Sequence, residues 1–131
     1  MFVDSNILIY LLRPDSTFHS RAKEAFSGVA LKGSIRINGV VYAEICASFA
    51  TASMASDWLA GNAIELEASS QEALFRASRA FLQYKAADGP RVSLLPDFFI
   101  GADAAVAGVP LLTNDPARYR TYFPELELIT P

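Results

Sequence analysis

The sequence predicts an α/β protein with a mainly parallel sheet of four to five strands. Short apolar runs of strand length alternate along the chain with longer segments whose apolar residues recur at helical spacing. Strands that alternate with helices form parallel sheets whose two faces are covered by those helices. The chain has 131 residues, 52% of them hydrophobic, which suffices for a substantial core. We therefore expect residues 1–131 to form a single domain.

The first six residues, M-F-V-D-S-N, carry the strongest local signal. Met1–Val3 is an apolar run that predicts a buried strand, Asp4 follows it, and Ser5–Leu12 has the pattern of a helix. Open α/β sheets place their ligand sites outside the carboxyl ends of the strands, so we expect Asp4 on the floor of a crevice. The alternative is that Asp4 only caps the helix, because Asp is a favoured N-cap residue.

The remaining elements follow from periodicity and from breaker residues, beginning with an interruption at Arg13-Pro14-Asp15. The expected helices are Phe18–Phe26, Val40–Ala52, Ser53–Gly61, the amphipathic Ser69–Lys85, the Ala- and Gly-rich Phe98–Val106, and Pro116–Tyr122. The expected strands are Ser34–Asn38, Ala63–Leu66, Pro110–Thr113 and Glu127–Thr130. A turn bracketed by Gly28 and Gly33 and a loop at Ala86–Pro90 complete the pattern.

Four acids lie at the starts of elements or in apolar surroundings: Asp4, Glu44, Asp97 and Asp115. A parallel sheet brings Asp4 and Asp115 to one edge, where helices that begin there also place Asp97 and Glu44. Clustered carboxylates repel one another, which favours a divalent cation between them. The alternatives are helix caps at Asp97 and Asp115. Glu44 is the only charge in an apolar segment, so we expect it not to face open water. A buried charge needs a partner, which for Glu44 is either the cation or an Arg side chain.

Two further polar residues are expected to lie outside the cluster. Asp103 follows Asp97 by six residues, about 120° further around a helix, so we expect it at an exposed or rim position. His19 is the only histidine and lies in a polar stretch, which is typical of a solvated helix residue. Metal ligands in this chain would then be mostly oxygen atoms, which suits Mg²⁺ or Mn²⁺.

Composition excludes several classes of protein. A net charge of −3 and a pI of about 5.0 argue against broad non-specific binding of nucleic acid through Lys and Arg. They do not exclude a nucleic-acid enzyme whose positive charge comes from metal ions. Cys46 is the only cysteine, so no intrachain disulfide forms. No run reaches the roughly 18 apolar residues of a membrane span, and the N-terminus lacks signal-peptide features. The single cysteine fits a reducing compartment, and we expect a cytoplasmic protein.

Four fragments make the chain resemble the PIN-domain ribonucleases, and among them the VapC-like toxins of toxin–antitoxin pairs. They are F-V-D-S-N-I-L at the start, V-V-Y-A-E-I around Glu44, L-P-D-F-F-I-G-A-D-A at 95–104 and L-L-T-N-D-P-A-R-Y at 111–119. The fragments come in the family's order and span nearly the whole chain. Asp103 departs from the family pattern, in which His or a small residue is more usual. The resemblance implies a PIN-like three-layer α/β/α fold.

The resemblance also implies an Mg²⁺- or Mn²⁺-dependent endoribonuclease toxin that cleaves single-stranded or looped RNA by attack of water on a phosphodiester. One or two ions would be held by Asp4, Glu44, Asp97 and Asp115. The carboxylates or the water would be oriented by Ser5, Asn6, Thr113 and Asn114.

The implied partner is a cognate VapB-like antitoxin, one of whose Arg side chains would enter the acidic crevice. Its apolar residues would dock on exposed parts of Leu8, Leu11, Leu12 and Phe18, unless these pack inside or in a homodimer interface, which we also expect. One alternative is a PIN-type nuclease or RNA-processing protein without an antitoxin. Another is an Mg²⁺-binding, receiver-like signalling module, which is disfavoured because the expected strand at Ser34–Asn38 does not end in an Asp.

Overall fold

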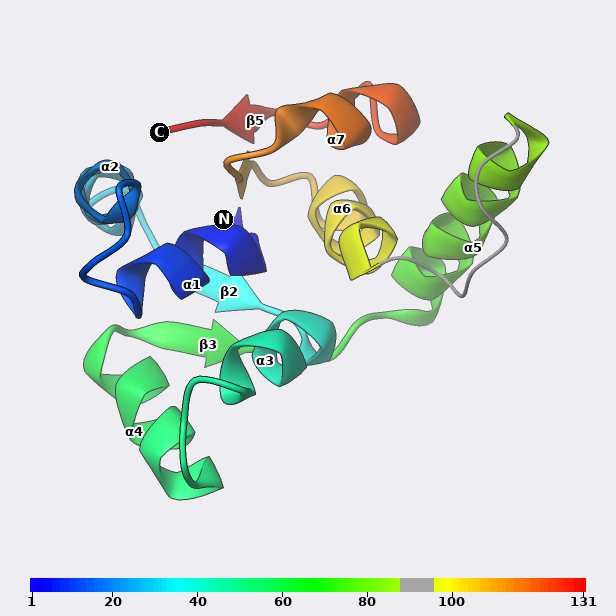
Figure 1. The fold of residues 1–131 in the computed structure, drawn as a ribbon. Coiled ribbons are helices and arrows are strands. Elements are labelled where there is room, and N and C mark those ends of the chain that lie inside the picture. The colour runs from blue at the N-terminus through cyan, green and yellow to red at the C-terminus, as the bar shows by residue number, and fades with distance from the viewer. Residues whose placement is uncertain (88–95) are drawn as a thin grey trace.

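The computed structural model describes residues 1–87 and 96–131 (Figure 1). The elements in chain order are β1 (Phe2–Val3), α1 (Ser5–Leu11), α2 (His19–Ala30), β2 (Ile35–Ile37), α3 (Gly39–Cys46), α4 (Ala52–Gly61), β3 (Ile64–Leu66), α5 (Gln71–Ala86), α6 (Pro96–Ala107), β4 (Leu111–Leu112), α7 (Pro116–Tyr122) and β5 (Leu128–Ile129).

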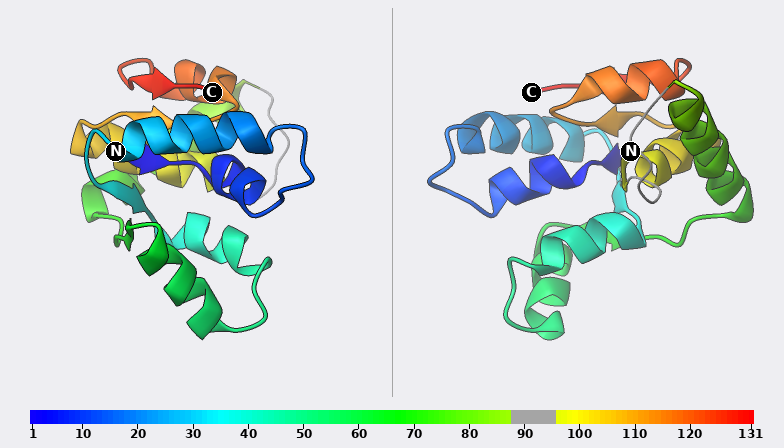
Figure 2. Two further views of the ribbon diagram at one scale, coloured as in Figure 1. Left: turned by 90° about the vertical axis from the view of Figure 1, so that its left-hand side faces the viewer. Right: turned by 45° about the vertical axis from the view of Figure 1, so that its right-hand side comes forward.

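The strands form one five-stranded sheet in the order β3-β2-β1-β4-β5, and all its pairings are parallel. Helices α1 to α4 cover one face and α5 to α7 the other, as Figures 1 and 2 show from three sides. This division follows from right-handed crossovers, because the chain first steps from β1 to β2 to β3 and then returns to β4 and β5. The expected three-layer α/β/α fold with a parallel sheet is confirmed.

The order of the strands makes β1 and β4 neighbours at a topological switch point. The chain leaves β1 toward one face of the sheet and leaves β4 toward the other, which opens the edge between them to ligands. The register pairs Phe2 with Leu111 and Val3 with Leu112, so the next residues along, Asp4 and Thr113, face each other past the strand ends.

The residues of β1 and β4, the two strands at the switch point, are buried on both faces of the sheet. Phe2, Val3, Leu111 and Leu112 all lie in the hydrophobic core, as expected for parallel strands covered by helices on both sides. The buried polar residues Asp4, Ser5 and Thr113, which directly follow these two strands, therefore stand out against an apolar core. Within residues 1–87 and 96–131, no helix is long and apolar enough to cross a membrane.

Most expected elements are present within a few residues of their expected ends. Two expectations were wrong. Gly28 lies inside α2 instead of starting a turn, and the helix expected at Val40–Ala52 ends at Cys46. Thr51 begins the next helix, because its Oγ1 accepts a hydrogen bond from the Met54 backbone N–H at 3.2 Å. Of the loop expected at Ala86–Pro90, Ala86 is the last residue of α5, and residues 88–90 lie outside the described residues.

Candidate active site

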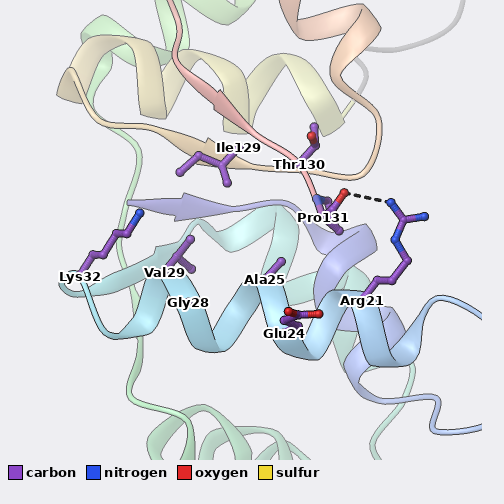
Figure 3. A pocket seen from close by; sticks show the side chains of 9 residues that line it. All are labelled: Arg21, Glu24, Ala25, Gly28, Val29, Lys32, Ile129, Thr130 and Pro131. Atoms are coloured by element: carbon purple, nitrogen blue, oxygen red, sulfur yellow. Dashed lines mark hydrogen bonds between the residues drawn. The ribbon is translucent and has the colours of Figure 1, made fainter.

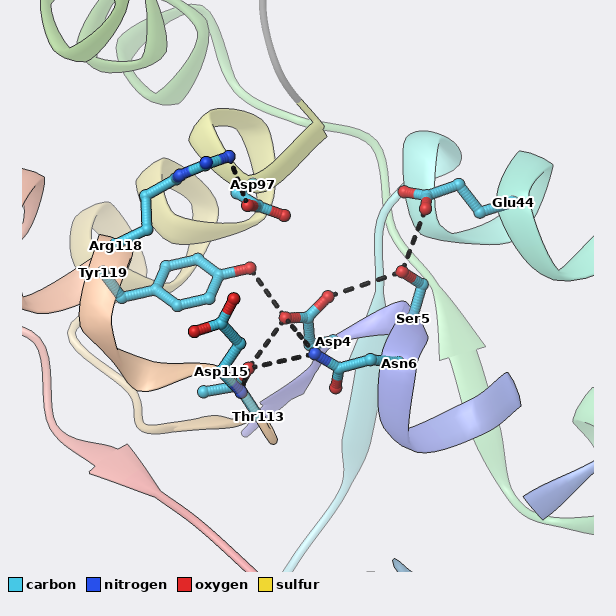
Figure 4. Close-up of polar contacts among 9 residues, drawn as sticks. All are labelled: Asp4, Ser5, Asn6, Glu44, Asp97, Thr113, Asp115, Arg118 and Tyr119. Atoms are coloured by element: carbon cyan, nitrogen blue, oxygen red, sulfur yellow. Dashed lines mark hydrogen bonds and ion pairs between the residues drawn. The ribbon is translucent and has the colours of Figure 1, made fainter. Parts of the chain in front are cut away.

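Asp4 is the buried centre of the polar cluster at the ends of β1 and β4 (Figure 4). It occupies the N-cap position of α1, but its side chain makes no capping hydrogen bond to that helix among the described residues. Its Oδ2 instead accepts hydrogen bonds from Thr113 Oγ1 and Tyr119 Oη, both at 2.8 Å, and from Asn6 Nδ2 at 3.3 Å. The side chain is 4% exposed. The alternative that Asp4 only caps the helix is therefore wrong.

Polar residues next to Asp4 join the ends of the two strands. The Asn6 amide donates to Asp4 and accepts from the Asn114 backbone N–H at 3.2 Å, so it spans from β1 to β4. Thr113 Oγ1 donates to Asp4 and accepts from the Asp115 backbone N–H at 3.1 Å. Asn114 thus contributes through its backbone. These contacts fix the relative positions of the two strand ends and of the residues that follow them.

Glu44 approaches the cluster from α3, on the other side of Asp4. Ser5 Oγ lies 3.1 Å from Glu44 Oε2 and 3.4 Å from Asp4 Oδ1, so one hydroxyl lies between two carboxylates. Partial burial of the carboxylate raises the pKa of Glu44, and the nearby charges of Asp4 and Asp97 raise it further, whereas the Ser5 hydrogen bond lowers it. The expectation that Glu44 avoids open water was wrong, because α3 buries Val41 and Ile45 and leaves Glu44 exposed.

Asp97 and Asp115 complete the acidic group from α6 and α7. Burial raises the pKa of Asp97, and so do the charges of Asp4 and Asp115, while Arg118 lowers it. Arg118 Nη1 lies 3.1 Å from Asp97 Oδ2, in a pair about one third exposed on each side. Asp115 is exposed at the N-cap position of α7 and makes no capping hydrogen bond through its side chain among the described residues. The capping alternative for Asp115 is therefore wrong too.

The four acids share one electrostatic environment without forming a closed ligand set. Within the described part of the chain, no three His, Cys, Asp or Glu side chains converge closely enough to hold a metal ion by themselves. Yet the charge of Asp4 raises the pKa of both Glu44 and Asp97, and that of Asp115 raises the pKa of Asp97. This all-oxygen donor set fits a hard cation such as Mg²⁺ or Mn²⁺ that keeps several of its water ligands.

Asp103 lies in a separate buried network, not at an exposed or rim position as expected. It is 6% exposed, and its Oδ2 accepts hydrogen bonds from Asn38 Nδ2 at 2.7 Å and from Ser69 Oγ at 2.8 Å. Asn38 in turn caps α3, because its Oδ1 accepts from the Val41 backbone N–H at 2.9 Å. Burial raises the pKa of Asp103 despite the two donors. Asp103 thus ties α6 to the start of the helix that carries Glu44.

Two residues of the site were not identified from the sequence: Arg118 and Tyr119. They are neighbours on α7, and each contacts a different acid, Asp97 and Asp4 respectively. Tyr119 is 1% exposed, and burial together with the charge of Asp4 raises the pKa of its phenol far above the ordinary value. A sequence signal existed, since Tyr119 follows Asp115 by one helical turn and so lies above the same strand end.

Two hollows flank α2 and are separate from the acids. One, of about 390 Å³, lies between α2 and the segment after β5, where Arg21 donates to the Pro131 carbonyl at 3.0 Å (Figure 3). The other, of about 470 Å³, is bounded by α1, α2 and α4, and we refer to it as the α1–α2–α4 groove. Its apolar lining includes Leu11, Phe26, Leu31 and Trp58.

Comparison with known proteins identifies both a family and a fold. The sequence model of the PIN domain matches residues 1–124. No curated protein sequence matches the chain significantly.

Among solved structures, VapBC2 from Rickettsia felis, bound to a DNA fragment from its promoter, is similar with a TM-score of 0.73 and 16% identity over 99% of this chain and 97% of the other. A toxin–antitoxin complex from Klebsiella pneumoniae has a TM-score of 0.71 and 22% identity, over 99% of this chain and 96% of the other. VapBC-1 from nontypeable Haemophilus influenzae has a TM-score of 0.70 and 14% identity, over 98% of this chain and 96% of the other.

Proposed function

The chain belongs to the PIN domain family, and from this premise we propose that it is a divalent-metal-dependent endoribonuclease of the VapC toxin type. The substrate is single-stranded or looped RNA, and the reaction is hydrolysis of a phosphodiester bond. The observation that carries this proposal is the position of the acids: Asp4 is buried at the β1–β4 switch point, the Ser5 hydroxyl lies between it and Glu44, and Asp97 lies close enough to feel the charges of Asp4 and Asp115. Membership of the PIN family sets aside the receiver-like alternative.

One or two Mg²⁺ or Mn²⁺ ions would be held, in part through water, by the four acids Asp4, Glu44, Asp97 and Asp115. When bound, such an ion supplies a water molecule of lowered pKa and offsets the negative charge of the phosphodiester. Attack of water on phosphorus breaks the bond to the 3′ oxygen and leaves a 5′-phosphate and a 3′-hydroxyl. The chain's only histidine, His19, contacts the Tyr10 carbonyl at the start of α2, so a carboxylate-based mechanism suits this site better than a histidine base.

The residues around the acids hold them in place for this chemistry. Thr113 and Asn6 fix Asp4 through its Oδ2, and Ser5 lies between Asp4 and Glu44. Asn114 contributes a backbone donor to Asn6. A preorganised set of carboxylates avoids the need to reorganise polar groups during the reaction, which is the main source of electrostatic catalysis.

RNA cleavage by the Asp4→Asn variant tests the mechanism. We expect wild-type protein to cleave RNA with Mg²⁺ or Mn²⁺ and to stop when EDTA is added, and folded Asp4→Asn to be inactive under all of these conditions. Asp57→Asn is the matched control, because Asp57 is an exposed Asp on α4 outside the site. Cleavage by folded Asp4→Asn at the wild-type rate, or EDTA-resistant cleavage by wild type, would refute the mechanism.

We propose that the partner is a VapB-like antitoxin that binds the α1–α2–α4 groove and inserts an Arg among the acids. The structures named above are of toxins in complex with antitoxins. In this chain Leu11 and Leu31 line the groove, Leu31 is 90% exposed, and Phe18 on the segment before α2 is also exposed. Leu8 was expected at this surface, but it is fully buried in the core and does not take part.

Co-purification with the product of the neighbouring gene tests the partner. The neighbour should bind the protein and lower its metal-dependent cleavage, and Leu31→Glu should weaken binding while cleavage by the free protein is kept. Met54→Glu, at an exposed residue of α4 outside the groove, is the control. If the neighbour neither binds nor inhibits, the protein is instead a PIN-type nuclease or RNA-processing protein without an antitoxin.

A homodimer is the second proposed assembly, and the exposed apolar face of α5 supports it. Leu74, Phe75 and Leu82 are all about half exposed or more on this one helix, which is an unfavourable state for a monomer in water. Sedimentation of wild type should give a dimer, and Phe75→Glu should shift it to a monomer. A wild-type monomer at high protein concentration would contradict the proposal.

A further inference from the structure

The two oxygens of the Asp4 carboxylate lie in different surroundings. Oδ2 accepts three hydrogen bonds, from Tyr119, Thr113 and Asn6. Oδ1 has one neighbour among the described donors, Ser5 Oγ at 3.4 Å, and that hydroxyl lies closer to Glu44, at 3.1 Å. A hydroxyl carries a single proton, so it cannot fully satisfy both acceptors. Oδ2 is therefore saturated, and Oδ1 is the oxygen left to bind a cation.

Tyr119 is held in place by close packing against α6. Its ring packs against α6 at Gly101, where an added Cβ would lie 3.1 Å from Tyr119 Cδ1 and 2.5 Å from Phe123 Cε2. The distance to Phe123 is shorter than real Cβ atoms essentially ever show, so any side chain at position 101 would force the Phe123 ring to shift and would press on the Tyr119 ring. Tyr119 and Phe123 are each 1% exposed. The phenol therefore cannot turn away from Asp4 without opening the α6–α7 contact.

The helix that carries Tyr119 also begins at a second acid of the cluster. Asp115 occupies the N-cap position of α7, Arg118 contacts Asp97, and Tyr119 contacts Asp4 (Figure 4). A single rigid element thus sets the positions of acids from β1, α6 and its own start. Ser5 and Asn6, by contrast, belong to the first turn of the helix that Asp4 itself begins.

We propose that Tyr119 is a positioning residue that locks Oδ2 of Asp4 and so presents Oδ1 as the single metal-binding oxygen of this carboxylate. This inference rests on the proposed function, since it concerns the same acids. It adds a residue that does not itself touch the cation or the RNA. Removing a residue that orients a metal ligand commonly weakens metal binding or activity by about 10- to 100-fold.

The test is Mn²⁺ binding to Tyr119→Phe, measured by calorimetry or by the EPR signal of free Mn²⁺, without RNA. We expect binding weaker by about 10-fold or more, with a folded protein, because the substitution removes only the hydroxyl. Tyr122→Phe is the control on the same helix, whose ring packs on Phe98 and Tyr84, and it should bind Mn²⁺ like wild type. Wild-type affinity in Tyr119→Phe, or an equal loss in Tyr122→Phe, would overturn the proposal.

RNA cleavage gives a second measurement that a purely structural role would not change. In Tyr119→Phe, kcat at low Mn²⁺ should fall while KM for RNA stays the same, and raising the Mn²⁺ concentration should restore kcat. A rise in KM that Mn²⁺ does not reverse would contradict the positioning role. If wild type cleaves no RNA at all, the proposed function fails, but the binding comparison still decides whether Tyr119 positions a metal-binding Asp4.

Discussion

The substitution Asp103→Ala provides the sharpest test of how the core supports the site. Asp103 Oδ2 accepts two short hydrogen bonds, at 2.7 Å from Asn38 and 2.8 Å from Ser69. Hydrogen bonds to a charged group contribute roughly 1.5–3 kcal/mol each, so the gross loss is about 3–6 kcal/mol. Burial disfavours the charged form of Asp103 and raises its pKa, so removing the charge offsets part of this loss. We expect a net destabilisation of about 3 kcal/mol.

This free energy corresponds to a large shift in melting temperature. An unfolding entropy of about 2.1 cal/mol/K per residue over 131 residues gives roughly 0.28 kcal/mol/K, so the melting temperature should fall by about 11 °C. Thermal and urea unfolding followed by circular dichroism measure the change. Asp103→Asn is the control, because its amide oxygen can still accept from Asn38 and Ser69, and it should lose much less. If Asp103→Ala unfolds within about 1 kcal/mol of wild type, the network does not hold α6 to α3 as reasoned.

Three further predictions concern packing, pH and metal binding. Gly101→Ala should destabilise the protein by about 1–3 kcal/mol in thermal unfolding, because the new Cβ would overlap Phe123, whereas Gly28→Ala, with open space around it, should be neutral or stabilising. Burial raises the pKa of Glu44 in the folded protein, so ionisation of Glu44 disfavours folding once the pH rises above 4.5. In EDTA, the free energy of unfolding of wild type should therefore fall relative to that of Glu44→Gln as the pH is raised from 4.5. A difference between the two proteins that does not change with pH in urea unfolding would refute this reasoning. Mg²⁺ at about 100 times its dissociation constant should stabilise wild type by about 2.7 kcal/mol. Asp97→Asn should reduce this gain and should stabilise the metal-free protein, because it removes a charge from the acidic cluster. An unchanged response to Mg²⁺ in Asp97→Asn would exclude Asp97 as a ligand.

The sequence by itself determined the elements and the positions of the acids along them. Two short apolar runs, Met1–Val3 followed by Asp4 and Pro110–Thr113 followed by Asn114, identified the ends of the strands that meet at the site. Pro116 directly after Asp115 identified the start of α7. These are signals within a few residues of chain, where backbone propensity and side-chain periodicity act. They sufficed for the fold class, and the four fragments sufficed for the family.

Only the tertiary structure decided which of these residues meet and which are exposed. The sequence does not fix the order β3-β2-β1-β4-β5, and that order is what places Thr113 against Asp4 across 109 positions and Tyr119 across 115. The exposure of Glu44 and the burial of Asp103 depend on how α3 and α6 are rotated against each other, which neither helix encodes alone. Packing of distant elements fixes the partners of a polar group, and a buried carboxylate is stable only where that packing supplies its donors.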